Sequence, residues 1–138
     1  MKITKTIITR ELRDFIVDGF IEHDIQTLGY SGRDQEQTAF TIKVDNEIAG
    51  VTCLLPFWGG LWVKILFVQE KFRKQGIARK LMEQAFIFAK EQNCDFAFVE
   101  TMSFQAPEFY QKLGFELEYS RGGYAEGSKI HYLRKILK

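Results

Sequence analysis

The spacing of apolar residues divides the chain into strand-like and helix-like stretches. Residues 2–9 alternate apolar and polar side chains and predict a first strand, and Thr9 is a residue type that caps helices. Apolar residues then recur at three- and four-residue spacing from Leu12 to Ile21, which predicts one or two helices. The polar, glycine-containing stretch at residues 29–37 ends this pattern and predicts a loop.

The middle of the chain predicts an antiparallel meander. Three runs rich in β-branched and aromatic residues cover residues 38–44, 47–55 and 61–68. The dipeptide Asp45-Asn46 separates the first two runs, and the segment PFWGGL separates the second from the third. Because short turns of this kind join antiparallel neighbours, we expect the three strands to lie side by side.

The next stretch predicts a strand, a helix and a second strand. Apolar residues keep helical spacing from Ile77 to Ala89, Asn93 marks the end of the helix, and residues 95–100 have the composition of a buried strand. A unit of this length suits a right-handed crossover between parallel strands.

The last part of the chain predicts a short helix and two closing strands. Pro107 lies near the start of the helix at residues 106–114, and strands at 115–120 and 129–137 flank a glycine-rich loop. We therefore expect one mixed α/β domain over residues 1–138, with a central sheet of six to seven strands and about four flanking helices.

Composition narrows the range of function. The 138 residues are 46% hydrophobic and 27% charged, which suits a single folded domain. A net charge of +1 gives no overall field that would attract nucleic acid or an anionic membrane, so we expect neither as a partner. No window holds the ~20 apolar residues of a membrane span, and the first residues do not read as a signal peptide. Two cysteines, Cys53 and Cys94, do not form a disulfide framework, and together these features predict a cytoplasmic protein.

A basic turn marks the junction between the strand at 61–68 and the following helix. The first N–H groups of a helix lack partners, and its dipole favours an anion there. Gly76 lets the backbone approach such an anion closely, and flanking cations add positive charge. The sequence excludes a P-loop and the three-glycine dinucleotide fingerprint. Considered alone, the hexapeptide RKQGIA is equally compatible with a solvated, positively charged helix start.

The longer stretch around this turn resembles a known family. RKQGIARKLM, preceded by LWVKILFV and followed by FAFVETMSFQAPEFYQKLGFE, is similar to the core of the GNAT N-acetyltransferase superfamily. In that family the signature Gln/Arg-x-x-Gly-x-Gly/Ala holds the pyrophosphate of acetyl-CoA through backbone amides, and Arg73, Gly76 and Ala78 match its three positions. The resemblance extends from about Thr38 to the C-terminus. It implies a GNAT-like fold with splayed fourth and fifth strands, acetyl-CoA as cosubstrate and no metal.

The resemblance also implies roles for individual residues. The pyrophosphate would lie against Arg73, Lys74, Gln75, Gly76, Ile77, Ala78 and Arg79. The pantetheine arm would run beside the backbone of Leu66, Phe67 and Val68, and an N–H of Phe67 or Val68 would stabilise charge on the thioester oxygen. Tyr110 occupies the position of the family's general acid, beside the sulfur of the cosubstrate, and its phenol carries a proton at neutral pH.

Two positions depart from the family pattern. Ser103 stands where many members carry an asparagine that contacts the pantetheine region, and we expect its shorter hydroxyl to reach the cofactor only through water. Lys64 stands where several members carry an acidic residue. The general base is therefore unassigned. Glu100 is a candidate, while His23 and His131 qualify because histidine titrates near neutral pH. A structural role is the stronger expectation for both histidines.

These features predict transfer of an acetyl group to a primary amine of a small molecule or a protein. Trp58, Trp62 and Tyr124 are candidates to line the acceptor pocket, with core or turn packing as the other interpretation. The other function class that we consider is a catalytically silent acyl-CoA-binding or sensing module. The chain could be a monomer or a homodimer, since an apolar C-terminal strand could pair with another chain.

Overall fold

The computed structural model describes residues 1–33 and 36–138. Residues 34–35, in the middle of the predicted loop at 29–37, lie outside the described residues. The elements follow in the order α1 (Arg10–Leu28), β1 (Thr38–Val44), β2 (Glu47–Phe57), β3 (Gly60–Val68), η1 (Glu70–Phe72), α2 (Ile77–Glu91), β4 (Phe96–Met102), α3 (Pro107–Lys112), β5 (Glu116–Arg121), η2 (Ala125–Gly127) and β6 (Ile130–Ile136).

The strands form one mixed sheet in the order β1-β2-β3-β4-β6-β5. Strands β3 and β4 run parallel and are joined by the α2 crossover, whereas the other neighbours are antiparallel. The predicted mixed α/β class and the meander are confirmed. In the described part of the chain there are three α-helices rather than about four, because the apolar residues from Leu12 to Ile21 lie in one continuous helix and η1 and η2 are single turns.

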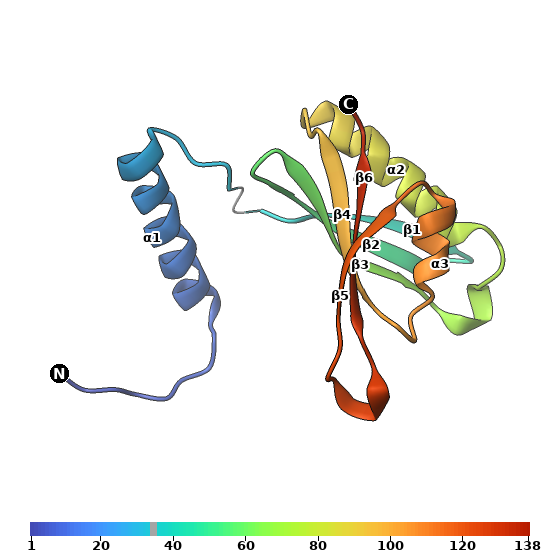
Figure 1. The fold of residues 1–138 in the computed structure, drawn as a ribbon, viewed down its shortest axis with the longest axis horizontal. Helices are drawn as coiled ribbons and strands as arrows, with labels where there is room; N and C mark the ends of the chain where they lie inside the picture. The colour runs from blue at the N-terminus through green and yellow to red at the C-terminus, as the bar shows by residue number, and fades with distance from the viewer. Residues whose placement is uncertain (34–35) are drawn as a thin grey trace.

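Helix α2 supplies the main cover of the sheet. Its apolar residues recur at three- and four-residue spacing, so they share one helix face. This face packs against Leu54 and Val63 of the sheet in the larger core cluster. Figure 1 shows α2 and α3 on the same side of the sheet. The buried residues of α2 are Ile77, Leu81, Met82, Ala85 and Ala89.

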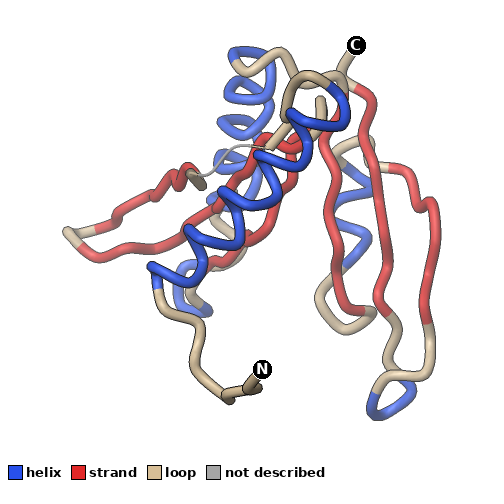
Figure 2. Tube along the Cα trace, turned by 90° about the vertical axis from the view of Figure 1, so that its left-hand side faces the viewer, coloured by secondary structure: helices blue, strands red, loops and turns tan. Residues whose placement is uncertain are grey.

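The sheet splits between β3 and β4. These strands pair only from Gly60 to Trp62, with Phe96 to Phe98 opposite. Gly60 permits this close approach, because a Cβ there would lie 2.6 Å from the Phe96 ring. Beyond the pairing, β3 stays with β2 as far as Val68, and Figure 2 shows the two groups of strands diverging. None of the described strands therefore pairs with the β4-facing edge of β3 over its last residues.

The first 33 residues, which we call the N-terminal arm, stand apart from the sheet (Figure 1). Thr9 caps α1 as predicted, since its hydroxyl accepts a hydrogen bond from the Leu12 N–H at 3.1 Å. The prediction of a strand at residues 2–9 is wrong: this stretch forms no strand, and Ile3 is 96% exposed. A strand needs a paired neighbour, and none of the described strands lies beside it. No described helix is both long and apolar enough to cross a membrane.

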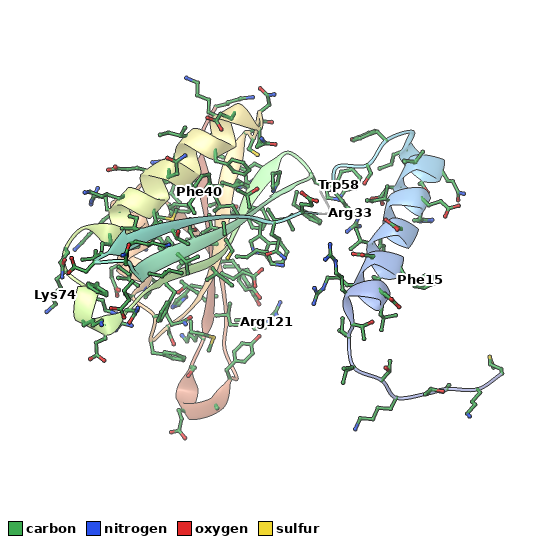
Figure 3. All side chains as sticks on the ribbon, turned by 180° about the vertical axis from the view of Figure 1, so that it is seen from behind. Phe15, Arg33, Phe40, Trp58, Lys74 and Arg121 are labelled. Atoms are coloured by element: carbon green, nitrogen blue, oxygen red, sulfur yellow. The ribbon has the colours of Figure 1, made fainter. Side chains whose placement is uncertain are left out.

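The arm meets the rest of the chain at the turn between β2 and β3. The Trp58 N–H donates to the Gly32 carbonyl at 2.7 Å, and Arg33 forms an isolated antiparallel bridge with Phe57. Figure 3 shows Arg33 and Trp58 together at this junction, with Phe15 farther out on α1. These contacts fix the position at which the arm joins the rest of the chain, which we call the base of the arm.

Candidate active site

The split in the sheet opens into two neighbouring cavities. The first has a volume of about 440 Å³ and lies between the end of β3, the basic turn and the segment that leads into α3. Its wall brings together six of the predicted site residues with a segment that was not predicted. The lining residues are Leu66, Phe67, Val68, Arg73, Ala78, Phe104, Gln105, Ala106, Phe109 and Tyr110.

The second cavity, of about 300 Å³, lies along the same gap beside the middle of β3 and the end of β4. It carries charged side chains of both signs, from Lys64 and Glu100. Four residues, Leu66, Phe67, Gln105 and Tyr110, belong to the walls of both cavities, so the two spaces adjoin. The other lining residues are Val63, Ile65 and Thr101.

Tyr110 is held at the boundary between the cavities by aromatic packing. Its ring contacts Phe109 and Phe115 edge to face, with centroids 5.3 and 5.6 Å away. Burial raises the pKa of the Tyr110 phenol above its ordinary value, which keeps the proton in place at neutral pH. None of the described residues hydrogen-bonds the hydroxyl, which leaves it available to a bound molecule.

The basic turn presents backbone N–H groups at the start of α2. Lys74 and Gly76 both adopt left-handed conformations, with φ of 64° and 78°, and Gly76 occupies the N-cap position without a side chain to cap the helix. A Cβ at Gly76 would meet no atom of the described residues within 4 Å. The Arg73 Nε donates to the Val68 carbonyl at 3.1 Å and so ties the turn to the end of β3. This geometry offers unsatisfied donors and open space to an anion.

The other residues of the predicted cradle are outside the cavity walls. Lys74, Gln75 and Arg79 are exposed on the turn and on the first turn of α2. Ile77 is 6% exposed and packs in the smaller core cluster with Ala49 and Leu81, so its side chain serves the core. Their expected contact with a ligand is through the backbone or through long-range charge.

Ser103 lies apart from both cavities. Its hydroxyl accepts a hydrogen bond from the Lys129 N–H at 3.0 Å, and its own N–H donates to the Lys129 carbonyl at 2.8 Å. These bonds tie the end of β4 to the start of β6. The hydroxyl at this position therefore has a structural partner in the protein.

The three candidate general bases lie in different parts of the structure. Glu100 is exposed and lines the second cavity. His131 is outside it, with its Nδ1 2.7 Å from the Ser120 hydroxyl oxygen, and His23 belongs to α1. Of these three, Glu100 is the one that borders the gap.

The aromatic candidates for the acceptor pocket have other neighbours. Trp58 packs against Tyr30 at the base of the arm. The Trp62 ring stacks on Phe98 at 5.8 Å, which leaves it on the sheet face beside the second cavity. The Tyr124 hydroxyl accepts a bond from Arg121 at 3.4 Å. None of the three is among the described residues that line the two cavities.

The segment Phe104, Gln105 and Ala106 is the part of the site that sequence reasoning missed. Ala106 adopts φ of 58°, and the Gln105 side chain accepts a hydrogen bond from the Met102 N–H at 2.9 Å. The available signal was position, because ligands of open sheets bind beyond the carboxyl ends of strands. The segment follows β4 directly.

The first cavity adjoins two features that suit an extended ligand with an anionic end. The free edge of β3 offers backbone groups to the extended pantetheine part of acyl-CoA, and the start of α2 offers N–H groups to its pyrophosphate. The family's fourth and fifth strands correspond to β3 and β4, and their predicted separation is present. The residues that would hold the donor molecule are thus brought to one side of Tyr110.

Comparisons with known proteins agree with this geometry. Residues 5–115 match the acetyltransferase (GNAT) family. An acetyltransferase of Agrobacterium fabrum is 32% identical over 126 residues, which are 91% of this chain and 90% of that protein. Blasticidin-S acetyltransferase of Streptomyces morookaense is 38% identical over 81 residues, 58% of this chain and 60% of that protein.

A solved structure matches nearly the whole chain. The crystal structure of an Agrobacterium tumefaciens protein described as an acetyltransferase superposes with a TM-score of 0.82 at 29% identity, covering 99% of this chain and 98% of that one. GNAT acetyltransferases take their acetyl group from acetyl-CoA. With the split sheet, the basic turn and the match over most of its length, this chain belongs to the GNAT acetyltransferase family.

Proposed function

We propose that this acetyltransferase moves an acetyl group directly from acetyl-CoA to a primary amine of a small molecule, with both substrates bound in the split between β3 and β4. The observation that carries the proposal is the position of Tyr110, whose side chain lines both cavities. One cavity adjoins the anion-binding turn, and the other adjoins the carboxylate of Glu100. A donor and an acceptor in these spaces would meet at Tyr110.

Tyr110 acts as the general acid in this proposal. The thiolate of coenzyme A leaves when the thioester bond breaks, and a positioned O–H assists departure by transferring its proton to sulfur. Burial raises the pKa of Tyr110, so the group keeps its proton until that moment. The packing of its ring between Phe109 and Phe115 holds the hydroxyl in place.

The backbone of β3 orients the donor. The last residues of this strand pair with β2 on one side and face the first cavity on the other. An N–H of Phe67 or Val68 that points across the gap would stabilise negative charge on the acetyl carbonyl oxygen as the amine attacks. The N–H groups at the start of α2 would hold the pyrophosphate at the far end of the cavity.

Glu100 is the proposed acceptor of the amine's proton. It is exposed at the end of β4 and lines the second cavity, where an ammonium group would be attracted to it. A carboxylate can take the proton directly or through one water. Lys64 lines the same cavity from β3, and its charge disfavours acceptors with several positive charges close together.

The size of the second cavity supports a small acceptor. Its volume of about 300 Å³ is at the lower end of the range for small-molecule sites. The similarity to blasticidin-S acetyltransferase also supports an acceptor of this size class. A small amine-bearing metabolite or antibiotic is therefore proposed in preference to a protein amine.

The test uses purified protein with acetyl-CoA and a panel of amines. Acetyl-CoA should raise the unfolding temperature, since a ligand that binds the native state stabilises it by about 2.7 kcal/mol at a hundred times its Kd. Release of free thiol should then follow addition of blasticidin S or amino acids, more weakly with polyamines because of the charge of Lys64, and not with a peptide that has a free amino terminus. Stabilisation without thiol release on any amine would favour the silent acyl-CoA-binding module. Absence of any stabilisation would contradict both functions.

A further inference from the structure

One face of the sheet is covered by none of the described helices of its own chain (Figure 1). Pairs of opposite residues on β2 and β3 place their side chains on the same face, and the residues between them point to α2. We call the uncovered side the open face. Ile65 and Phe67 on this face are 49% and 52% exposed. The open face is formed by Val51, Cys53, Leu55, Trp62, Ile65 and Phe67.

Helix α1 carries a second apolar surface, and none of the described elements of its own chain packs against it. Phe15 and Phe20 are 75% and 51% exposed, and together with Ile16 they line a shallow groove along the helix. Of the described residues of α1, Asp24 alone is buried. Helices with this many apolar side chains are stable in water only when the apolar surface is covered.

The arm is held away from its own open face by specific contacts. The Arg33 guanidinium pairs with Asp24 at 2.8 Å, and it lies over the rings of Phe20 and Phe57 at 4.8 and 5.5 Å. Ser31 donates a further hydrogen bond to Asp24 at 2.9 Å. Folding of α1 onto its own sheet would break these contacts and the Gly32–Trp58 hydrogen bond, whereas cover by another molecule leaves them intact.

The exposed area is too large for a compact monomer. A folded chain of 16.1 kDa exposes about 7,400 Å², whereas this chain exposes 10033 Å². The difference is about 2,600 Å² per chain, or about 5,000 Å² for two chains, which is in the range of permanent dimers. An interface of this size is what covering both apolar surfaces would provide.

The superposition with the Agrobacterium tumefaciens structure extends beyond the sheet and its helices. Residues 36–138 make up 103 of the 138 residues, so their superposition alone could reach a TM-score of about 0.75 (103/138), and the observed score is 0.82. Part of this score must come from the arm. Some residues of the arm therefore have counterparts at similar positions in that crystal structure.

We propose that two copies of this chain exchange their N-terminal arms, so that α1 of each copy covers the open face of the other. Such an exchange is reciprocal, and one twofold axis closes it. Ile65 and Phe67 belong both to the open face and to the wall of the second cavity. The partner's arm therefore also borders the acceptor side of the active site, a consequence that rests on the proposed function.

The first test is the mass of the protein in solution by light scattering. Wild-type protein should have twice the mass of one chain. Ile16→Glu, which places a charge on the apolar surface of α1, should be a folded monomer. Ile87→Glu is the matched control, because Ile87 is also an exposed isoleucine on a helix, at 53% against 41% for Ile16, but lies on α2. A monomeric wild type, or equal dissociation by both substitutions, would overturn the exchange.

A second measurement locates the interface. Cys53 is partly exposed on the open face of a single chain, and Cys94 is 2% exposed. A thiol reagent should react at Cys53 at least about tenfold more slowly in the wild-type dimer than in Ile16→Glu, because cover by a folded element limits access. Equal rates would place the dimer interface elsewhere and refute the exchange.

A third measurement tests the shared active site. Ile16→Glu should bind acetyl-CoA as wild type does but require a higher acceptor concentration for half-maximal rate. Mixing it with Gly76→Val, whose arm is intact, should restore rate above the sum of the two variants, because the intact arm can cover the intact site. No gain in rate on mixing would show that the arm does not contribute to the acceptor site. If wild type itself shows no transfer, the proposed function fails, while mass and thiol reactivity still decide the exchange.

Discussion

Replacement of Gly76 by alanine separates the proposed anion-binding role of the basic turn from its role in folding. Gly76 has φ of 78°, and a Cβ there would meet no protein atom within 4 Å. The cost to folding is therefore backbone strain alone, about 1–2 kcal/mol for an L-residue in the left-handed region. For a domain of this size that lowers the unfolding temperature by roughly 3–8 °C.

Gly59 provides a matched control for this strain. It has φ of 85° and also has no protein atom within 4 Å of an added Cβ, but it lies in the turn between β2 and β3, outside both cavities. Gly59→Ala should therefore lose similar stability. Gly76→Ala should in addition disturb the N–H groups that we propose hold the pyrophosphate, and hydrogen bonds to a charged group contribute about 1.5–3 kcal/mol each. Loss of one such bond weakens acetyl-CoA binding roughly ten- to hundredfold.

Isothermal titration with acetyl-CoA and thermal unfolding of the free proteins check both parts. We expect equal losses of stability in the two variants and a weaker Kd only in Gly76→Ala. If the two variants bind acetyl-CoA equally well, the turn does not hold the pyrophosphate. A loss of binding in Gly59→Ala as large as in Gly76→Ala would show that general strain, not the turn, controls affinity.

Three further predictions concern Tyr110, Lys64 and Asp24. Tyr110→Phe should lower kcat roughly a hundredfold at unchanged acetyl-CoA affinity; because burial raises its pKa, the wild-type rate should show no alkaline decline from this group below about pH 10, as a pH–rate profile can check. Lys64→Ala should lower the KM of acceptors that carry a second positive charge about fivefold more than that of acceptors with a single amine, since one like charge at about 4 Å costs about 1 kcal/mol in water. Burial of Asp24 acts to raise its pKa, but hydrogen bonds from Ser31 and Arg33 and the nearby charges of Arg33 and His23 outweigh burial and lower it. The contact therefore stabilises the arm at pH values above 3.8, the ordinary pKa of the group, and is lost as the pH falls through the lower pKa of the folded state. Acid should thus release the arm, which light scattering would detect as a fall in mass. Asp24→Asn should remove this pH dependence, whereas Asp14→Asn should preserve it.

The sequence predicted the body of the fold well because its elements have strong local signals. The alternation in β1 and the helical spacing of α2 each match a face that is buried within the chain. Pro107 and Gly114 likewise bound α3 as expected. Patterns of this kind are read correctly when the partner surface belongs to the same molecule.

The arm shows where such reasoning fails. Residues 2–9 alternate as a strand should, but no described strand of this chain pairs with them. The apolar pattern indicates that these side chains are buried in the functional protein, but it does not indicate which molecule buries them. The aromatic candidates failed for a related reason: Trp58 and Trp62 are equally suited to binding a ligand and to packing against Tyr30 or Phe98, and composition cannot separate the two.

The short pairing between β3 and β4 divides the sheet into two parts with little backbone connection. Three residue pairs, from Gly60–Phe96 to Trp62–Phe98, and the stack of Trp62 on Phe98 are the link across the sheet at this point. The two parts can therefore act as separate units in local opening, each with its own rate of amide hydrogen exchange. A substrate that hydrogen-bonds along the free edge of β3 and contacts α3 joins them, so binding should slow exchange in strands that it never touches.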